Sequence, residues 1–270
     1  MLNRTEWLDL PEPLRDAIRA RTGHILTART ASEGRNSALA AIVDTTDGTI
    51  FLKGIRNDHR GVVTQGREAL INPYVRPVAP ALLWHLDDVA GWNVLAFEYI
   101  EGRHPSYAPD SPDLPAVVAA IDALGALPCP AIPIKDAARW RTYLDDHDTA
   151  VLAGDTLSHT DYNPANLIIT GDGSVRLIDW AWPTRAAAWI DPCCLVLWLI
   201  ASGHTPVQAE EWAARTRAWA SAPPASLDVF ARVNVRVWNE IAGNSADQWK
   251  QRMAEAARQW ADLRLATVSR

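Results

Sequence analysis

The 270-residue chain lacks several features that mark whole classes of protein. Its three cysteines, Cys129, Cys193 and Cys194, are an odd number, two of them adjacent, and they show no metal-ligand spacing. This pattern excludes a disulfide framework and favours reduced thiols in a cytoplasmic protein. The formal net charge is −6, so the basic surface of a nucleic-acid-binding protein is missing.

Long apolar segments and familiar phosphate-binding loops are also missing. The first ten residues carry Glu6 and Asp9 and lack the apolar core of a signal peptide. The most apolar run, residues 193–201, is too short to span a bilayer. Neither Gly-x-Gly-x-x-Gly nor a loop ending in Gly-Lys-Ser/Thr occurs. We therefore expect a soluble protein with no membrane association.

The residues that are present fit a globular protein. Hydrophobic residues make up 48% of the chain and charged residues 21%, so global disorder is not expected. The 13 tryptophans include Trp198, Trp212 and Trp219, which lie in apolar or amphipathic runs. Core packing is the expected role for most of them.

The first hundred residues predict a small sheet with one main helix. Residues 11–21 have apolar positions at helical spacing and should form a short helix that stops at Gly23. Strands are expected over residues 37–44, 49–55, 81–87 and 92–100. The main helix should cover residues 62–72 and end before Pro73.

The rest of the chain predicts a helical region interrupted by one hairpin. Residues 101–115 are rich in Pro, Gly, Ser and Asp and should form a linker. Helical patterns then cover residues 116–127, 136–147, 192–202 and 206–220, with two more towards the C-terminus. Residues 166–170 and 175–179 flank a Gly-Asp-Gly-Ser turn and should form the hairpin. This pattern predicts an α+β protein with two lobes, residues 1–100 and 101–270.

The densest group of polar residues surrounds that hairpin. His159, Asp161 and Asn163 precede it, Asn166 opens its first strand, and Asp179 closes its second. A hairpin brings its two ends together, so the side chains of Asn166 and Asp179 should converge. Phosphoryl transfer needs a carboxylate to orient the attacking hydroxyl and oxygen ligands for Mg²⁺. Asp161 suits the first role and the converging pair the second, although each residue alone is also ordinary in a turn.

This segment resembles the catalytic loop of the aminoglycoside phosphotransferase-like kinases, a superfamily that includes choline kinases. The matching residues are His159, Asp161, Asn163-Pro164, Asn166 and Ile178-Asp179-Trp180. The resemblance implies a bilobal protein-kinase-like fold in which the helical lobe carries the catalytic hairpin. It implies that Asp161 is the catalytic carboxylate, that Asn166 and Asp179 bind Mg²⁺, and that His159 shapes the loop. Ala165 and Tyr162 are mild departures, because the family often has glycine and an aliphatic residue there.

The resemblance also implies a nucleotide site in the front lobe. Lys53, in an apolar strand, would pair with Glu68 on the following helix and bind the α- and β-phosphates of ATP. From the residues alone, two alternatives stay open. Lys53 could face solvent from an edge strand, and Glu68 could be a solvated helix residue.

Two further segments would complete the nucleotide site. The polar turn at residues 32–37 could cover the phosphates with its backbone N–H groups. Its candidate residues are Ser32, Gly34, Asn36 and Ser37. Residues 97–102 would be the hinge between the lobes, and main-chain groups at Glu98 and Ile100 would bind the adenine edge.

The short segment after Asp179 favours a small-molecule acceptor. Asp191 follows closely, and the family pattern implies that it braces the catalytic loop. No long peptide-binding activation segment separates the two residues. An acidic cluster formed by Asp145, Asp146 and Asp148 could meet a cationic substrate or be a solvated helix end. Among the neighbouring tryptophans, Trp182 could face the acceptor.

We therefore expect an ATP- and Mg²⁺-dependent kinase that phosphorylates a hydroxyl of a small molecule. An aminoglycoside, another antibiotic, a sugar, an amino alcohol or a metabolite would all suit the same machinery. The alternatives are a non-catalytic nucleotide-binding scaffold on the same fold and a protein kinase. The sequence does not indicate an oligomeric state.

Overall fold

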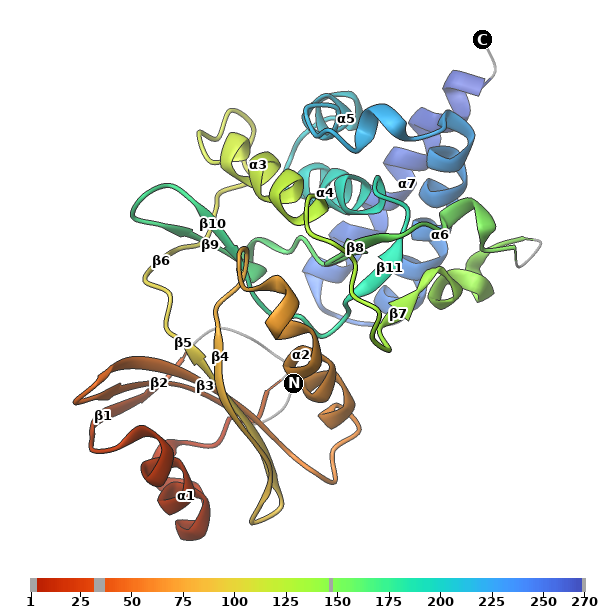
Figure 1. Ribbon diagram of the computed structural model, residues 1–270. Helices are drawn as coiled ribbons and strands as arrows, with labels where there is room; N and C mark the ends of the chain where they lie inside the picture. The colour runs from red at the N-terminus through yellow and green to blue at the C-terminus, as the bar shows by residue number, and fades with distance from the viewer. Residues whose placement is uncertain (1–3, 32–36, 146–147, 269–270) are drawn as a thin grey trace. The chain divides into compact units, whose positions relative to one another are not determined.

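The computed structural model describes residues 4–31, 37–145 and 148–268, and the chain divides into two compact units (Figure 1). The first unit comprises Met1–Arg103 and Arg176–Ala181. The second comprises His104–Val175 and Trp182–Arg270. The short segment 176–181, which the sequence-based division placed with the helical part, packs with the strand-rich unit instead.

A five-stranded antiparallel sheet forms the centre of the first unit, in the order β1-β2-β3-β5-β4. Its strands are β1 (Ile25–Thr30), β2 (Leu39–Thr45), β3 (Gly48–Arg56), β4 (Leu82–Val89) and β5 (Trp92–Glu98). Lys53 lies on the central strand, paired with Ala40 of β2 and Leu95 of β5. The edge-strand alternative for Lys53 is therefore wrong.

The two faces of this sheet are covered by different helices. Helix α1 (Glu12–Thr22) buries Leu14 and Ile18 in a core that includes Leu52 of β3. Successive side chains of a strand point to opposite faces, so Lys53 points away from that core. Helix α2 (Val62–Val75) lies against β3, β4 and β5 on the Lys53 face. It includes Pro73, where the sequence predicted its end. A proline in the last turn interrupts few hydrogen bonds.

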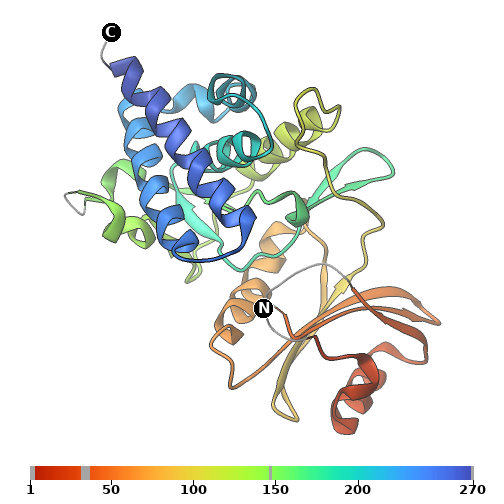
Figure 2. The same cartoon turned by 180° about the vertical axis from the view of Figure 1, so that it is seen from behind.

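Five α-helices dominate the described residues of the second unit. They are α3 (Leu114–Gly125), α4 (Ile190–Ala201), α5 (Pro206–Ala213), α6 (Pro224–Ala242) and α7 (Gln248–Val268). Helices α6 and α7 pack side by side along much of their length (Figure 2). Helix α4 is apolar almost all round and is buried against α5 and α7, as expected for a central helix. No helix in the described parts of the chain has the length and apolarity needed to cross a membrane.

Short strands and 3-10 helices make up the remaining elements of both units. A small sheet has the order β7-β11-β8, from Lys135–Asp136, Thr184–Ala186 and Thr156–Ser158. The remaining short elements are β6 (Gly102–Arg103), β9 (Leu167–Thr170), β10 (Val175–Leu177) and the 3-10 helices η1 (Trp7–Asp9), η2 (Ala137–Tyr143), η3 (Ala150–Leu152), η4 (Pro164–Asn166) and η5 (Trp219–Ser221).

Three further elements differ clearly from what the sequence predicted. The helix expected over residues 136–147 is the 3-10 helix η2, which stops at Tyr143. The helix expected over residues 206–220 ends at Ala213, whose carbonyl accepts a bond from the Thr216 hydroxyl. The catalytic hairpin is shorter than expected. Asn166 ends η4 instead of opening a strand, and Asp179 lies two residues beyond β10.

Candidate active site

A buried group of three charges lies within the first unit. The Nζ of Lys53, on β3, is 2.6 Å from Glu68 Oε2 on α2 and 2.8 Å from Asp179 Oδ1. The side chains of Lys53 and Glu68 are 15% and 5% exposed, and that of Asp179 is 30% exposed. The Lys–Glu ion pair implied by the resemblance is therefore present, and the solvated-helix alternative for Glu68 is wrong.

Electrostatics keep this lysine charged. Burial by itself would lower the pKa of Lys53, but the carboxylates of Asp179 and Glu68 outweigh burial and raise that pKa. Burial raises the pKa of Glu68, and the Lys53 ammonium opposes that rise. With both carboxylates ionised, the group carries one net negative charge. A charge of that sign favours a bound cation beside Asp179.

The segment that carries Asp179 is fixed by contacts within the first unit. The backbone of Asp179 is left-handed, with φ of 62°, a conformation that aspartate tolerates better than most residues. The Trp180 N–H donates to Glu68 Oε1 at 3.2 Å, and the buried Trp180 indole donates to the Leu177 carbonyl at 3.0 Å. The Leu177 N–H donates to the Val78 carbonyl at 2.7 Å. Neighbours on both sides therefore hold Asp179 in place.

The loop that carries Asp161 lies in the second unit and is tied together by local hydrogen bonds. The Asp161 N–H donates to Nδ1 of the buried His159 at 3.3 Å, and Asp161 Oδ1 accepts from the Asn163 N–H at 3.2 Å. The Asn163 side chain caps η4 by accepting from the Ala165 N–H at 3.0 Å. The Asn166 amide nitrogen donates to the Asp161 carbonyl at 3.4 Å.

Asp191, in the first turn of α4, also holds the loop that carries Asp161. Its carboxylate accepts from the backbone N–H groups of His159 and Thr160, both at 2.9 Å, and from the Tyr162 hydroxyl at 3.2 Å. Burial raises the pKa of Asp191, although these donors act in the opposite direction. Asp191 therefore makes the contacts expected of a brace.

The candidate Mg²⁺ ligands fit the ion in donor chemistry. Asp179 offers a carboxylate, and Asn166 offers an amide oxygen, because its amide nitrogen is directed at the Asp161 carbonyl. Mg²⁺ prefers such oxygen ligands and takes few of them from the protein. The two residues belong to different units, so their convergence on one ion stays a prediction.

The other predicted nucleotide contacts are less defined. Ser32, Gly34 and Asn36 lie outside the described residues. Ser37 is buried, and its carbonyl accepts a hydrogen bond from Arg4 at 3.2 Å. Glu98 ends β5, where its N–H donates to the Ala81 carbonyl at 2.9 Å, and Ile100 lies beyond the strand. Their contact with adenine stays a prediction.

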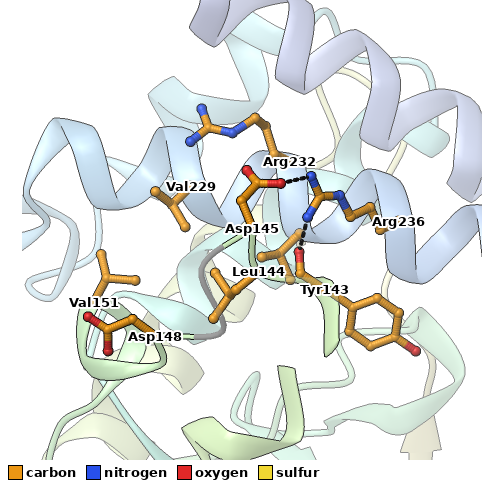
Figure 3. A pocket seen from close by; sticks show the side chains of 9 residues that line it. Tyr143, Leu144, Asp145, Asp148, Val151, Val229, Arg232 and Arg236 are labelled. Atoms are coloured by element: carbon orange, nitrogen blue, oxygen red, sulfur yellow. Dashed lines mark hydrogen bonds and ion pairs between the residues drawn. The ribbon is translucent and has the colours of Figure 1, made fainter. Parts of the chain in front are cut away.

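The acidic cluster before the catalytic loop borders a pocket of about 450 Å³ (Figure 3). Asp145 is paired with Arg236, which lowers the pKa of Asp145, and Asp148 accepts from the Ala150 N–H at 2.8 Å. Arg232 of α6 lines the same pocket. Two arginines therefore balance the two aspartates, and the pocket is not an acidic surface. Asp146 lies outside the described residues.

The neighbouring tryptophans differ in exposure. Trp180 and Trp189 are 2% and 4% exposed and pack in the core, as expected for most tryptophans of this chain. Trp182 is 40% exposed and lies under two cations, with Lys135 Nζ 4.7 Å and Arg139 Cζ 5.2 Å from its ring centre.

Two residues near Asp161 were missed by the sequence analysis. Tyr107, from the expected linker, is 3% exposed, and its hydroxyl has no hydrogen-bond partner among the described residues. Burial, and then the Asp161 carboxylate, raise the pKa of Tyr107. Arg139 of η2 donates to the Thr160 hydroxyl at 2.8 Å. Nothing in the sequence around this tyrosine or this arginine indicates that it lies near Asp161.

Solved structures with the same architecture cover nearly the whole chain. Choline kinase LicA from Streptococcus pneumoniae is 14% identical, and the match covers 92% of this chain and 99% of the kinase with a TM-score of 0.63. An aminoglycoside phosphotransferase from Alicyclobacillus acidocaldarius is 12% identical, with 97% and 98% covered and a TM-score of 0.63. The chain has the fold of aminoglycoside phosphotransferases and choline kinases. No protein-family profile and no curated protein sequence matches it.

Other structures with this kinase-like fold contain ligands. A thermostable mutant of aminoglycoside phosphotransferase APH(4)-Ia was solved with AMP-PNP and hygromycin B. It is 15% identical to this chain, with 93% of this chain and 99% of the other covered and a TM-score of 0.61. LicA was also solved with AMP. At these identities the likeness establishes the fold, and the neighbours that share it are phosphotransferases.

Proposed function

We propose that this chain is a small-molecule kinase that transfers the γ-phosphoryl group of Mg-ATP to an acceptor hydroxyl. The observation that carries the proposal is the bridging of Lys53 between Glu68 and Asp179. A largely buried lysine on the central strand of a sheet stays charged only if it is paired, and here two carboxylates surround its ammonium. Such an arrangement has an evident use if the lysine binds phosphate oxygens and one carboxylate binds the metal ion.

In the proposed complex, the nucleotide lies against the sheet of the first unit. Lys53 would donate to the α- and β-phosphates, and Glu68 would keep its ammonium directed at them. Main-chain groups at Glu98 and Ile100 would bind the adenine edge. Ser37, with the neighbouring candidates Ser32, Gly34 and Asn36, would contribute N–H groups to the phosphates.

Asp161 would orient the acceptor hydroxyl for in-line attack and take up its proton as the new bond to the γ-phosphorus forms, while the bond from that phosphorus to the β,γ-bridging oxygen breaks and ADP leaves. The bonds from His159 and Asn163 and the brace from Asp191 would keep its carboxylate aimed. Asn166 and Asp179 would hold Mg²⁺, which would neutralise charge on the phosphates when bound.

The acceptor in this proposal is a hydroxylated small molecule, and the protein would act in the cytoplasm, where ATP is available. Proteins that share this fold include a choline kinase and an aminoglycoside phosphotransferase, so an amino alcohol and an aminoglycoside are the first acceptors to screen. The short connection from Asp179 to Asp191 supports this class over a peptide.

Calorimetric titration with ATP, with and without Mg²⁺, tests the proposal directly. Wild-type protein should bind ATP, and Mg²⁺ should tighten binding. Asp179→Asn should lose most of the Mg²⁺ effect, whereas Arg236→Met, in the surface pair with Asp145, should keep it. Absence of ATP binding by the wild type in both conditions would overturn the kinase proposal.

A further inference from the structure

The residue before Asp161 has a strained backbone. Thr160 has φ of 68°, in the left-handed region that β-branched residues rarely adopt. The direction of the Asp161 side chain depends on this conformation, because the two residues share a peptide plane. Strain of this kind persists only where the surroundings hold it, and it is commonly found at functional sites. The contacts of Thr160 therefore decide where Asp161 points.

The backbone of Thr160 is held by Asp191, but its side chain is held by a different residue. Nη1 of Arg139 lies 2.8 Å from Thr160 Oγ1 and 2.8 Å from Thr184 Oγ1. Both hydroxyls also lie near the Trp182 carbonyl oxygen, at 3.3 Å from Thr160 and 2.8 Å from Thr184. All four residues belong to the second unit.

The donors in this network can be assigned from chemistry alone. A guanidinium can only donate, and Nη1 carries two hydrogens, one for each threonine oxygen. Each hydroxyl thus accepts from Arg139 and keeps its own proton for the Trp182 carbonyl. The result is a closed ring of four hydrogen bonds, in which losing one member leaves the others incomplete.

Arg139 is itself fixed by aromatic rings. Its Cζ lies 4.9 Å from the centre of the Trp140 ring and 5.2 Å from that of Trp182. Trp140 in turn packs edge-on against Phe230 of α6. A planar guanidinium suits such stacking and the forked donation together, and a lysine ammonium does so less well.

We propose that Arg139 is a positioning residue for phosphoryl transfer, which holds Thr160 in its left-handed conformation and so aims Asp161 at the acceptor hydroxyl. The inference rests on the proposed kinase function. It adds a residue that neither touches ATP nor belongs to the catalytic loop. Through Trp182 and Thr184, Arg139 also ties this loop to the segment that follows Asp179 in the sequence.

The test combines steady-state kinetics with a double-mutant cycle. Arg139→Met should lower kcat about 10- to 100-fold, because small misplacements of a catalytic group have effects of that size. KM for Mg-ATP should stay within about twofold of wild type. Thr160→Val, which removes only the hydroxyl, should lower kcat to a similar extent. The double variant should be little worse than either single one, because both remove the same interaction.

Conservative variants and a matched control separate positioning from general stability. Thr160→Ser keeps the hydroxyl and should retain near-wild-type kcat, and Arg139→Lys should be intermediate. Arg185→Met is the control, since Arg185 neighbours Thr184 but binds the Pro130 carbonyl at 2.7 Å and lies 4.0 Å from Asp155. Its kcat should be unchanged even if its melting temperature falls.

Hydrogen exchange gives a readout that does not need turnover. Amides of residues 157–163 should exchange several-fold faster in Arg139→Met than in Arg185→Met. Wild-type kcat in Arg139→Met, or effects of Arg139→Met and Thr160→Val that multiply, would overturn the positioning role while leaving the kinase proposal intact. A wild-type protein that does not bind Mg-ATP would overturn both.

Discussion

The surroundings of Lys53 and the loop that carries Asp161 are held together by different kinds of contact. In the first unit, Lys53 joins residues that are 15 and 126 positions away in the sequence, through buried ion pairs. In the second unit, hydrogen bonds between residues two to five positions apart tie the Asp161 loop together internally, and Asp191 and Arg139 hold it from 32 and 21 positions away. A local network can be recognised in sequence spacing, whereas a long-range one depends on the whole sheet and helix being in place.

The largest expected effect is on the loop side of this comparison. Asp161→Asn should lower kcat about 10²- to 10⁴-fold, because the amide cannot accept the proton of the attacking hydroxyl. The loop should survive, since the amide oxygen can still accept from the Asn163 N–H. Calorimetry should show ATP affinity close to wild type. Near-wild-type turnover would remove Asp161 from the mechanism.

The next effect is on stability in the first unit. Lys53→Met leaves Glu68 buried without its ammonium partner, which should reduce the free energy of unfolding by about 3 kcal/mol. The surface pair of Arg236 and Asp145 is the matched comparison, and Arg236→Met should cost much less, because an exposed ion pair contributes little to stability. Urea denaturation measures both. Equal losses in the two variants would contradict the distinction between buried and exposed pairs.

The pH dependence of stability tests the contribution of Lys53 in a second way. The pKa of Lys53 is raised in the folded protein, so the contribution of this lysine to stability is complete below its unfolded value of 10.5. That contribution declines as pH rises from there towards the folded pKa. The stability difference between wild type and Lys53→Met should thus be smaller at about pH 11 than at about pH 9. A difference that grows between about pH 9 and pH 11 would mean that the sign is wrong.

The smallest expected effect concerns the hydroxyl of Tyr107. Tyr107→Phe removes a buried polar group that has no partner among the described residues, so stability should stay the same or rise by about 1 kcal/mol. Thermal denaturation at neutral pH checks the sign. A clear loss of stability would reveal a hydrogen bond or bound water at this hydroxyl.

Much of the fold could be predicted from local sequence. The strands expected over residues 37–44 and 49–55 and the helical spacing of apolar residues over 11–21 gave elements close to those observed. Errors gathered where local patterns continue past the true end of an element. The pattern over residues 206–220 includes Thr216, which closes the helix end through its hydroxyl. The opposite error occurs at Pro73, where the helix was expected to end although α2 continues to Val75. Such ends depend on individual side-chain bonds that periodicity does not detect.

The Asp161 loop was recognisable because its candidate residues stand at fixed spacing in one short segment. The same reasoning missed Arg139 and Tyr107, because each approaches the loop from a separate segment with an ordinary composition. The sequence analysis also did not predict that arginines of α6 lie in the pocket lined by Asp145 and Asp148.

The sequence by itself determined the α+β class and the location of the candidate catalytic residues, because turn residues, periodicity and motif spacing act over a few positions. Only the tertiary structure decided which charges meet. It placed Lys53 on a central strand, brought Glu68 and Asp179 to its ammonium, and hydrogen-bonded Arg139 to Thr160. Side-chain partnership is a matter of distance in space, and distances between remote segments are fixed only when the core packs.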